Sequence, residues 1–518
     1  ELARITAGTV VVGRNDATAS GNVTVNATNM GAMGNTSGNL TVLSGGLLTV
    51  SGAVTKTAGS EANLTLRANK DISVASNTTI STASEPLNVV MNANLGNAGG
   101  GVILNSGAGV TTKGGDITMT GGGAATAAVL THAGVFLNNA TLDATGVEGG
   151  NISLTGTSNA NAPVGTSGYD GVRVAVGGAI KTSGAGNITI QGTHPTKSAS
   201  LSKRVVTSEA KGSGGSSGTV SITGDSSTST TTTSYIYGVM FSGAAEVTTT
   251  GGNISVTGFG GGGTGSISNQ GISVENANVK IMAGGAGTVT LNGTGGKGTN
   301  GSNYGIYLGN GKVGSAGGAI SMTGTGGQFA DNFGLVMANS FMLDGSANAP
   351  VTITADSINL AGGSILSGTA STTLQNKTAG TLINVGASDN LGAATGTRML
   401  GLTNAEINRI TAGNLHIGSS TAGNLTVSAA TTSNASTGHL HLQTAGNIAL
   451  NAALTVGDNP ATTPAVEATK NLSLNATGAT STVTQTAAIK ATGLELLGSN
   501  ASVVLANSGN DVQTLAGN

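Results

Sequence analysis

A seven-residue phrase of alternating apolar and polar residues recurs along the middle of the chain. Its first copy runs Gly115-Asp116-Ile117-Thr118-Met119-Thr120-Gly121, with Ile117 and Met119 on one side and the two threonines on the other. Alternation with a period of two predicts a half-buried β-strand. Further copies begin at residues 150, 186, 218, 252, 287 and 318, and a degenerate eighth copy spans 349–355. Their spacing of 31 to 36 residues is typical of a repeat architecture.

Two shorter apolar segments follow the phrase within each period. One begins with Gly and an aliphatic residue, as in Gly134-Val135-Phe136, and the other is exemplified by Ala140-Thr141-Leu142. Corners rich in Gly, Ser and Asn separate the segments, and none of them has helical spacing. Three short strands per turn predict an all-β parallel β-helix of about 20 coils, in which each coil pairs with the coils above and below it.

Coil length divides this predicted solenoid into three continuous segments. Residues 1–114 carry short coils, residues 115–355 carry long coils with Gly/Ser/Thr loops, and residues 356–518 return to short coils. A longer repeat is superimposed on the coils, because residues 1–8 match residues 406–413 and the similarity continues downstream. We expect one whole super-repeat followed by the start of the next, as in an excerpt of a longer repeat array.

Composition excludes several classes of partner and site. The 518 residues include 88 Gly and no Cys, only 8% are charged, and the formal net charge is −2. The near-neutral charge provides no electrostatic footprint for nucleic acid. The lack of Cys excludes disulfides and thiolate metal sites. A hydrophobic content of 37% with regular alternation indicates a folded chain, and no apolar run approaches the roughly 18 residues of a membrane helix.

Aromatic residues are confined to the long-coil segment, where all eleven lie between residues 136 and 341. Four of them lie just before the strands that begin with Gly and an aliphatic residue. They are Tyr169, Tyr237, Tyr304 and Phe333. One interpretation is an internal or corner stack that stabilises the solenoid, and the other is a ligand-facing aromatic strip. If the rod has a binding surface, we expect it on this side.

Catalytic and metal-binding alternatives have weaker support. Sugar lyases and hydrolases also use β-helices, but they need clustered acids, whereas the 22 acids here are spread thinly and Asp143 and Glu148 straddle a turn. His439 and His441 share one strand face, and His416 takes the equivalent position on a nearby strand. Three imidazoles can bind a divalent metal, yet outward strand residues in place of Thr explain them more simply. We therefore expect no enzyme, no cofactor and no metal site.

Asparagine precedes the first core residue of many strands, which also creates Asn-x-Ser/Thr triplets such as Asn151-Ile152-Ser153. We expect these asparagines to stack in a hydrogen-bonded ladder along the rod rather than to serve as glycosylation sites.

The C-terminal phrases carry a family resemblance. Ala491-Thr492-Gly493-Leu494-Glu495-Leu496-Leu497, then Asn507-Ser508-Gly509-Asn510-Asp511-Val512-Gln513-Thr514-Leu515, together with residues 406–418, resemble filamentous-haemagglutinin-type exoproteins. These are large bacterial adhesins exported through an outer-membrane partner by two-partner secretion. The resemblance is strongest over 1–50 and 400–518. It implies a right-handed β-helix, a place on the bacterial cell surface or outside the cell, and an outer-membrane transporter during export. It supplies no catalytic residue, and we find no amino-terminal secretion domain.

Two functions follow as expectations. The first is a non-enzymatic adhesin shaft that mediates attachment or biofilm formation, with glycans or proteins of a host or neighbouring cell as partners. The alternative is a structural subunit of an extracellular filament. In that case the chain would stack end to end, because neither end carries a capping segment and open β-helix ends expose unpaired strand edges.

Overall fold

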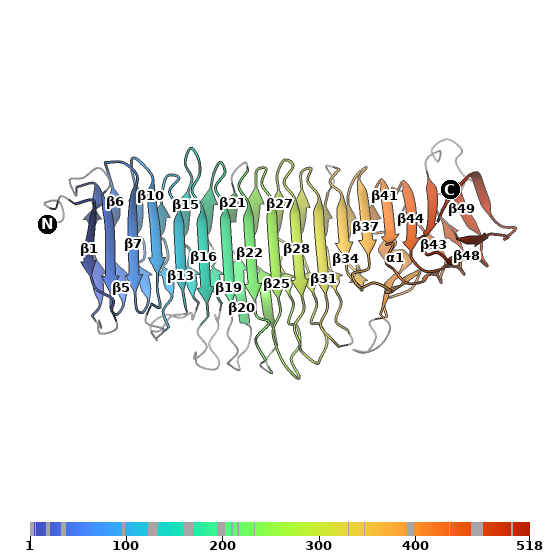
Figure 1. The fold of residues 1–518 in the computed structure, drawn as a ribbon, viewed down its shortest axis with the longest axis horizontal. Coiled ribbons are helices and arrows are strands. Elements are labelled where there is room, and N and C mark those ends of the chain that lie inside the picture. Colours follow the sequence, from blue (N-terminus) through green and yellow to red (C-terminus); the bar gives the residue numbers. More distant parts are fainter. Residues whose placement is uncertain are drawn as a thin grey trace.

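Short strands lie across the long axis of a rod, coil after coil, from β1 near one end to β51 near the other (Figure 1). The computed structural model describes residues 5, 7–16, 21–32, 38–95, 99–122, 133–158, 170–175, 177–193, 203–208, 211–214, 217–230, 232, 234–329, 331–345, 348–390, 398–434, 436–456, 470–498 and 501–517. Within each sheet neighbouring strands pair in parallel, which confirms the predicted parallel β-helix. Among the described residues, no helix is long and apolar enough to span a membrane.

Three sheets form the sides of the rod, and a fourth replaces one of them near the C-terminal end. Sheet A contains β1 (Thr9–Gly13), β4 (Asn39–Ser44), β7 (Ala62–Ala68), β10 (Leu87–Asn92), β13 (Ile117–Gly121), β16 (Ile152–Thr157), β19 (Ile188–Thr193), β22 (Val220–Asp225), β25 (Ile254–Phe259), β28 (Val289–Thr294), β31 (Ile320–Thr325), β34 (Val351–Thr354), β37 (Ser371–Gln375), β41 (Asn414–Gly418), β43 (Thr431–Thr432), β44 (His439–Thr444), β46 (Leu454–Thr455), β47 (Asn471–Ala476), β49 (Ile489–Leu497) and β51 (Asp511–Gly517). Sheet B contains β2 (Val23–Val25), β5 (Leu48–Val50), β8 (Ile72–Val74), β11 (Val102–Leu104), β14 (Val135–Leu137), β17 (Val172–Val174), β20 (Lys203–Ser208), β23 (Ile236–Phe241), β26 (Ile272–Val274), β29 (Ile306–Leu308), β32 (Leu335–Met337) and β35 (Ile358–Asn359). Sheet C contains β3 (Thr28–Asn29), β6 (Val54–Lys56), β9 (Thr79–Thr82), β12 (Gly109–Thr111), β15 (Thr141–Ala144), β18 (Ala179–Thr182), β21 (Lys211–Gly214), β24 (Glu246–Thr249), β27 (Lys280–Ala283), β30 (Lys312–Ser315), β33 (Met342–Asp344), β36 (Ser364–Leu366) and β40 (Ile410–Thr411). Sheet D contains β38 (Leu382–Val385), β39 (Met399–Leu402), β42 (Leu425–Val427), β45 (Ile448–Leu450), β48 (Thr482–Gln485) and β50 (Ser502–Val504). The helical turns are η2 (Met30–Ala32) and α1 (Asn404–Ile407).

The recurring phrase forms the sheet A strand of each long coil. In one such coil β25 is followed by β26 on sheet B and β27 on sheet C, after which β28 returns to sheet A. Ile254 of β25 pairs with Val289 of β28, so equivalent residues of the phrase stack in register. Two short members of sheet A, β43 and β46, pair with each other, and β46 also pairs with the first part of β49. The other 18 of its 20 strands mark successive coils.

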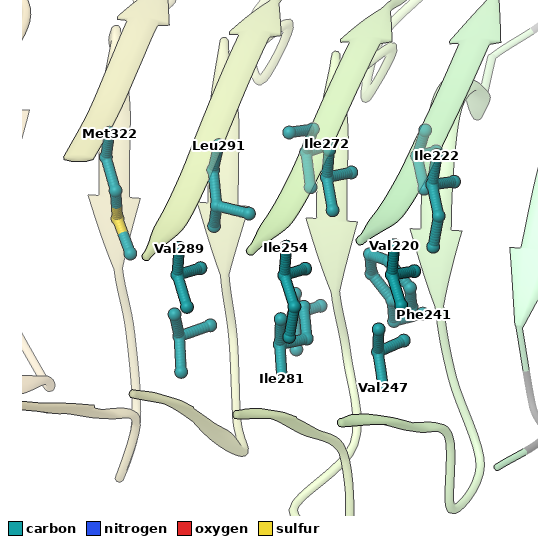
Figure 2. Packing of buried hydrophobic residues seen from close by; sticks show 14 of the residues in the cluster. Val220, Ile222, Phe241, Val247, Ile254, Ile272, Ile281, Val289, Leu291 and Met322 are labelled. Atoms are coloured by element: carbon teal, nitrogen blue, oxygen red, sulfur yellow. The ribbon is translucent and has the colours of Figure 1, made fainter. Parts of the chain in front are cut away.

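The inward side chains of the three sheets meet in one continuous apolar core. Ile254, Ile272 and Ile281, from the three strands of a single coil, are fully buried, and Figure 2 shows them stacked beside the residues of the neighbouring coils. The same core extends from Val10 to Leu494. Each such side chain contributes roughly 1.5–3 kcal/mol when it is removed from water, so every added coil brings its own stabilisation.

The last glycine of the phrase closes the corner between sheets A and B. A Cβ on Gly258 would lie 2.0 Å from the carbonyl oxygen of Gly271, and one on Gly324 would lie 2.1 Å from that of Gly334. The backbones that leave sheet A and enter sheet B therefore touch directly. The loop between the two strands begins and ends at this contact. Loops of different lengths can therefore be accommodated without a change in the coil.

Sheet B ends at β35, where the chain makes an excursion. After β38 the chain turns back, and β39 pairs with the edge of β38 opposite β42. The single turn α1 follows, and β40 then rejoins sheet C beside β36. The strand at 382–385 was expected from its alternation, whereas β39 and α1 were not.

The super-repeat predicted from the sequence folds alike in both copies. Strand β1 corresponds to β41, β4 to β44 and β5 to β45, with matching lengths. Gly13 and Gly418 end the first pair with φ angles of +85° and +92°. In each case a Cβ would lie 2.1 Å from a carbonyl oxygen of the next coil, at Leu43 and Gln443. The matched backbone details indicate the same coil built twice.

The expected asparagine ladder is present on sheet A. The backbone N–H of Asn151 donates to Asp116 Oδ1 at 2.7 Å, and that of Asn187 donates to Asn151 Oδ1 at 3.1 Å. The N–H of Thr219 donates in turn to Asn187 Oδ1 at 2.8 Å. Each side chain thus accepts from the backbone of the following coil, which fixes the register between coils.

Candidate ligand-binding surface

Three aromatic rings gather on the sheet B side of the rod. The ring centroids of Tyr304 and Tyr307 are 5.9 Å apart and nearly parallel, and those of Tyr304 and Phe333 are 6.0 Å apart in an edge-on arrangement. Tyr304 and Phe333 belong to adjacent coils, because the N–H of Gly305 donates to the carbonyl of Phe333. All three side chains are partly exposed. We call Tyr304, Tyr307 and Phe333 the aromatic cluster.

Of the other two predicted aromatic residues, Tyr237 does not extend this cluster. Tyr237 is only 6% exposed. The residue that follows it in the stack is Gln270, because the N–H of Gly238 donates to the carbonyl of Gln270. Tyr169 lies outside the described residues. The proposed strip is therefore interrupted at Gln270, and a ligand-facing role for its members stays a prediction.

A buried asparagine precedes three positions of this stack, Gln270, Tyr304 and Phe333, and forms hydrogen bonds between adjacent coils. Asn269 and Asn303 are fully buried, and Asn269 Nδ2 donates to Asn303 Oδ1 at 2.7 Å. The N–H of Asn303 donates to Asn332 Oδ1 at 2.8 Å. This second ladder was missed at the sequence level. Its signal is the recurring triplet of Asn, a larger side chain and Gly, as in Asn303-Tyr304-Gly305 and Asn332-Phe333-Gly334.

Two cavities are lined by residues that the sequence singled out. The first has a volume of about 440 Å³, and the second, of about 320 Å³, adjoins the aromatic cluster. Phe333 forms one wall of this smaller cavity. Its other lining residues are Asn359, Ala361, Ser388, Asp389, Thr403, Ala405, Glu406 and Arg409. The cavity lies at the excursion after β35, so the aromatic cluster leads directly into a pocket with polar walls.

Two carboxylates of this cavity replace the missing strand partner of β35. The backbone N–H of Ile358 donates to Asp389 Oδ1 at 3.4 Å, and that of Leu360 donates to Glu406 Oε1 at 2.9 Å. The other oxygen of Glu406 accepts from the N–H and hydroxyl of Thr403, which forms the capping box of α1. Both oxygens of Glu406 are therefore engaged in holding the backbone.

Asp389 has a strongly shifted protonation equilibrium. Burial raises the pKa of its carboxyl to about 8, and the charge of Glu406 raises it further, whereas donors from Gly401 and Ile358 act in the opposite direction. A neutral acid is thus presented beside Phe333 at neutral pH. No local pattern indicated this pair, because Asp389 and Glu406 meet only where β39 is placed beside β38 on the edge opposite β42. The capping-box pattern Thr403-x-x-Glu406 identifies just one of its members.

The three predicted histidines gather at the C-terminal end of sheet A, on its outer face. The rings of His416 and His441 are 4.9 Å apart in adjacent coils, and His439 shares their strand face. Burial lowers the pKa of both His416 and His441. Within the part of the chain that the structure describes, no group of three potential ligands could hold a metal ion. The histidines instead line the cavity of about 440 Å³.

Comparison with known proteins identifies no relative: no family model, no curated protein and no solved structure matches this chain.

Proposed function

We propose that this chain is the shaft of a non-enzymatic bacterial adhesin, exposed on the cell surface or secreted, that mediates attachment or biofilm formation. The observation that carries the proposal is a stiff stack of coils with an aromatic cluster on its side. A solenoid lengthens by adding coils, which suits a spacer between a cell and its target. The resemblance to filamentous-haemagglutinin-type exoproteins supports this setting and export through an outer-membrane transporter.

The ligand we propose is a glycan or a protein segment of a host or neighbouring cell. Aromatic faces pack against sugar rings and apolar side chains, while the neighbouring polar groups set orientation. Phe333 offers such a face next to Asn359, Asp389 and the exposed Arg409. The cavity volume of about 320 Å³ falls within the usual size range of small-ligand sites.

Binding of the labelled chain to a glycan array and to cultured cells tests this function. The double variant Tyr304→Ala and Phe333→Ala is expected to lose about tenfold or more in apparent affinity. Tyr235→Asn is the matched control, because Tyr235 is an exposed aromatic outside the cluster and Asn tolerates its φ of +65°. If the folded double variant binds as the wild type does, the aromatic cluster is not the ligand surface. If the wild-type chain binds neither the glycan array nor the cells, the adhesin proposal is wrong.

The alternative that we propose is a structural subunit of an extracellular filament that stacks end to end. Leu515 lies on β51, an edge strand of sheet A among the described residues, and is 70% exposed. Apolar strands at an open edge promote pairing with another chain. Electron microscopy over a range of protein concentrations separates the two functions. Long fibres that Leu515→Lys abolishes indicate a filament, whereas single rods at every concentration indicate a shaft.

A further inference from the structure

The outer face of sheet A carries an elongated hollow across β41, β44, β47, β49 and β51. Strand register places its wall residues in two columns along the rod axis. The first column is Asn414, His439, Asn471, Gly493 and Thr514, and the second is His416, His441, Ser473, Glu495 and Ala516. Leu440, Leu494 and Leu515 lie between the columns. Strands about 4.8 Å apart give this axial groove a length of about 19 Å.

Most side chains in the two columns of the axial groove are polar, and neutral groups predominate among them. Burial lowers the pKa of His416 and His441, so both imidazoles are uncharged at neutral pH and each offers one donor and one acceptor. Asn414 and Asn471 add amide groups that both donate and accept. Glu495 contributes a carboxylate, and no Lys or Arg is among the described residues that line the groove.

Ser473 places an unpartnered hydroxyl in the axial groove. Its side chain is only 8% exposed, and its Oγ has no hydrogen-bond partner among the described residues. Buried hydroxyls in folded proteins nearly always have a partner. Ser473 lies between His441 and Glu495 in the second column. A ligand hydroxyl at this point would supply the missing hydrogen bond.

The earlier super-repeat copy shows that the fold does not require these histidines. Val11, Asn39 and Thr41 occupy the positions of His416, His439 and His441 in the equivalent strands β1 and β4. In the long coils the two columns are mostly small polar residues, as at Asn253 and Ser255 on either side of Ile254 of β25. Since the same coils form with Val and Thr, the imidazoles are free to serve a ligand.

We propose that the axial groove binds a linear, uncharged, hydroxyl-rich oligosaccharide that lies along the rod. Hydrogen-bonding side chains recur at the coil spacing, which is close to the length of one pyranose unit. The imidazole faces supply stacking surfaces, and Glu495 disfavours anionic chains. This site is separate from the aromatic cluster and does not depend on it.

Saturation-transfer NMR and calorimetry on the full chain test the axial groove, with cellotetraose, maltotetraose and chitotetraose as neutral probes. A hyaluronan tetrasaccharide serves as the anionic probe, with Zn²⁺ and an extended hexapeptide as competing classes. At least one neutral probe is expected to bind to the wild-type chain. The double variant His416→Val and His441→Thr is expected to bind that probe with about tenfold lower affinity. These substitutions reproduce the residues of the earlier copy, so the variant is expected to fold.

Two further variants distinguish a binding role from a structural one. Ser473→Ala is expected to weaken the neutral probe without lowering the melting temperature, because its hydroxyl has no protein partner among the described residues. Ser255→Ala, on the same face in a long coil, is expected to leave binding unchanged. The proposal is overturned if no neutral probe binds at millimolar concentration, if the histidine variant binds equally well, or if Zn²⁺, the peptide or the anionic sugar is preferred.

Discussion

At the scale of single residues, two carboxylates at the excursion after β35 accept hydrogen bonds that a neighbouring backbone strand would otherwise accept. The N–H groups of Ile358 and Leu360 would otherwise pair with the next coil, and instead they donate to Asp389 and Glu406. An unpaired buried N–H is costly, so a side chain that reaches the end of a sheet stabilises the break. Glu406 accepts such a hydrogen bond and also caps α1, so it has two structural roles at once.

Replacing Glu406 is therefore expected to destabilise the chain markedly. Glu406→Ala removes the acceptor of Leu360 and both contacts to Thr403, at an expected cost of about 3 kcal/mol in the free energy of unfolding. Glu406→Gln keeps one carbonyl acceptor, so its cost is expected to be smaller. Urea denaturation measures both variants. An alanine variant as stable as the wild type would show that water or a nearby backbone segment replaces the carboxylate as hydrogen-bond acceptor.

Asp389 gives the same region a dependence on pH. Because the folded-state pKa of about 8 is higher than the ordinary 3.8, the native state holds a proton that the unfolded state releases. Its stabilising contribution is complete below about pH 3.8 and is lost as the pH rises through 8. Asp389→Asn keeps an acceptor without a charge, so it is expected to melt at the wild-type temperature at about pH 3 and increasingly above it as the pH rises to 9. Asp331→Asn, at an exposed position, is the control, and equal melting of Asp389→Asn and wild type at pH 9 would contradict the shift.

At the scale of elements, alternation predicted strands well and failed where tertiary contacts decide. The phrase beginning at Gly115 predicted a strand that the structure places at Ile117–Gly121. Its flanking glycines were visible in the sequence, but their backbone contacts across the corner were not. Strand β39 and helix α1 form because the chain doubles back onto an exposed sheet edge, which no local pattern encodes. His416 and His441 were recognised as neighbours because they occupy equivalent positions on their strands. The axial groove was not recognised, because its shape depends on tertiary contacts among several coils.

The corner glycines make a prediction at this scale. In Gly258→Ala the new Cβ would lie 2.0 Å from the carbonyl oxygen of Gly271, and backbone atoms cannot move aside without opening the corner. The expected cost is about 1–3 kcal/mol, as for other overpacked sites. Gly21→Ala is the control, because a Cβ there meets nothing within 4 Å. Chemical denaturation compares the two, and equal stability would mean that the corner adapts freely.

At the scale of the whole molecule, each coil touches mainly its immediate neighbours, so damage is expected to remain local. Leu291 of β28 is fully buried and stacks between Val256 and Met322 of the adjacent coils, within the core that Figure 2 shows. Leu291→Ala removes about 2–5 kcal/mol of local packing. In a solenoid with nearest-neighbour coupling, the lost stability is confined to the nearby coils while distant coils keep theirs.

Hydrogen exchange measured coil by coil tests this expectation. Amides of β25, β28 and β31 are expected to exchange faster in Leu291→Ala, while those of β7 and β44 keep their wild-type rates. Met282→Ala, on the neighbouring coil and only partly buried, is expected to change the exchange pattern much less. A uniform loss of protection along the rod would mean that the coils unfold as one cooperative unit. Local loss would instead mean that coils and loops can be exchanged one at a time, so a binding surface at one point of the rod can change while the rest of the shaft is retained.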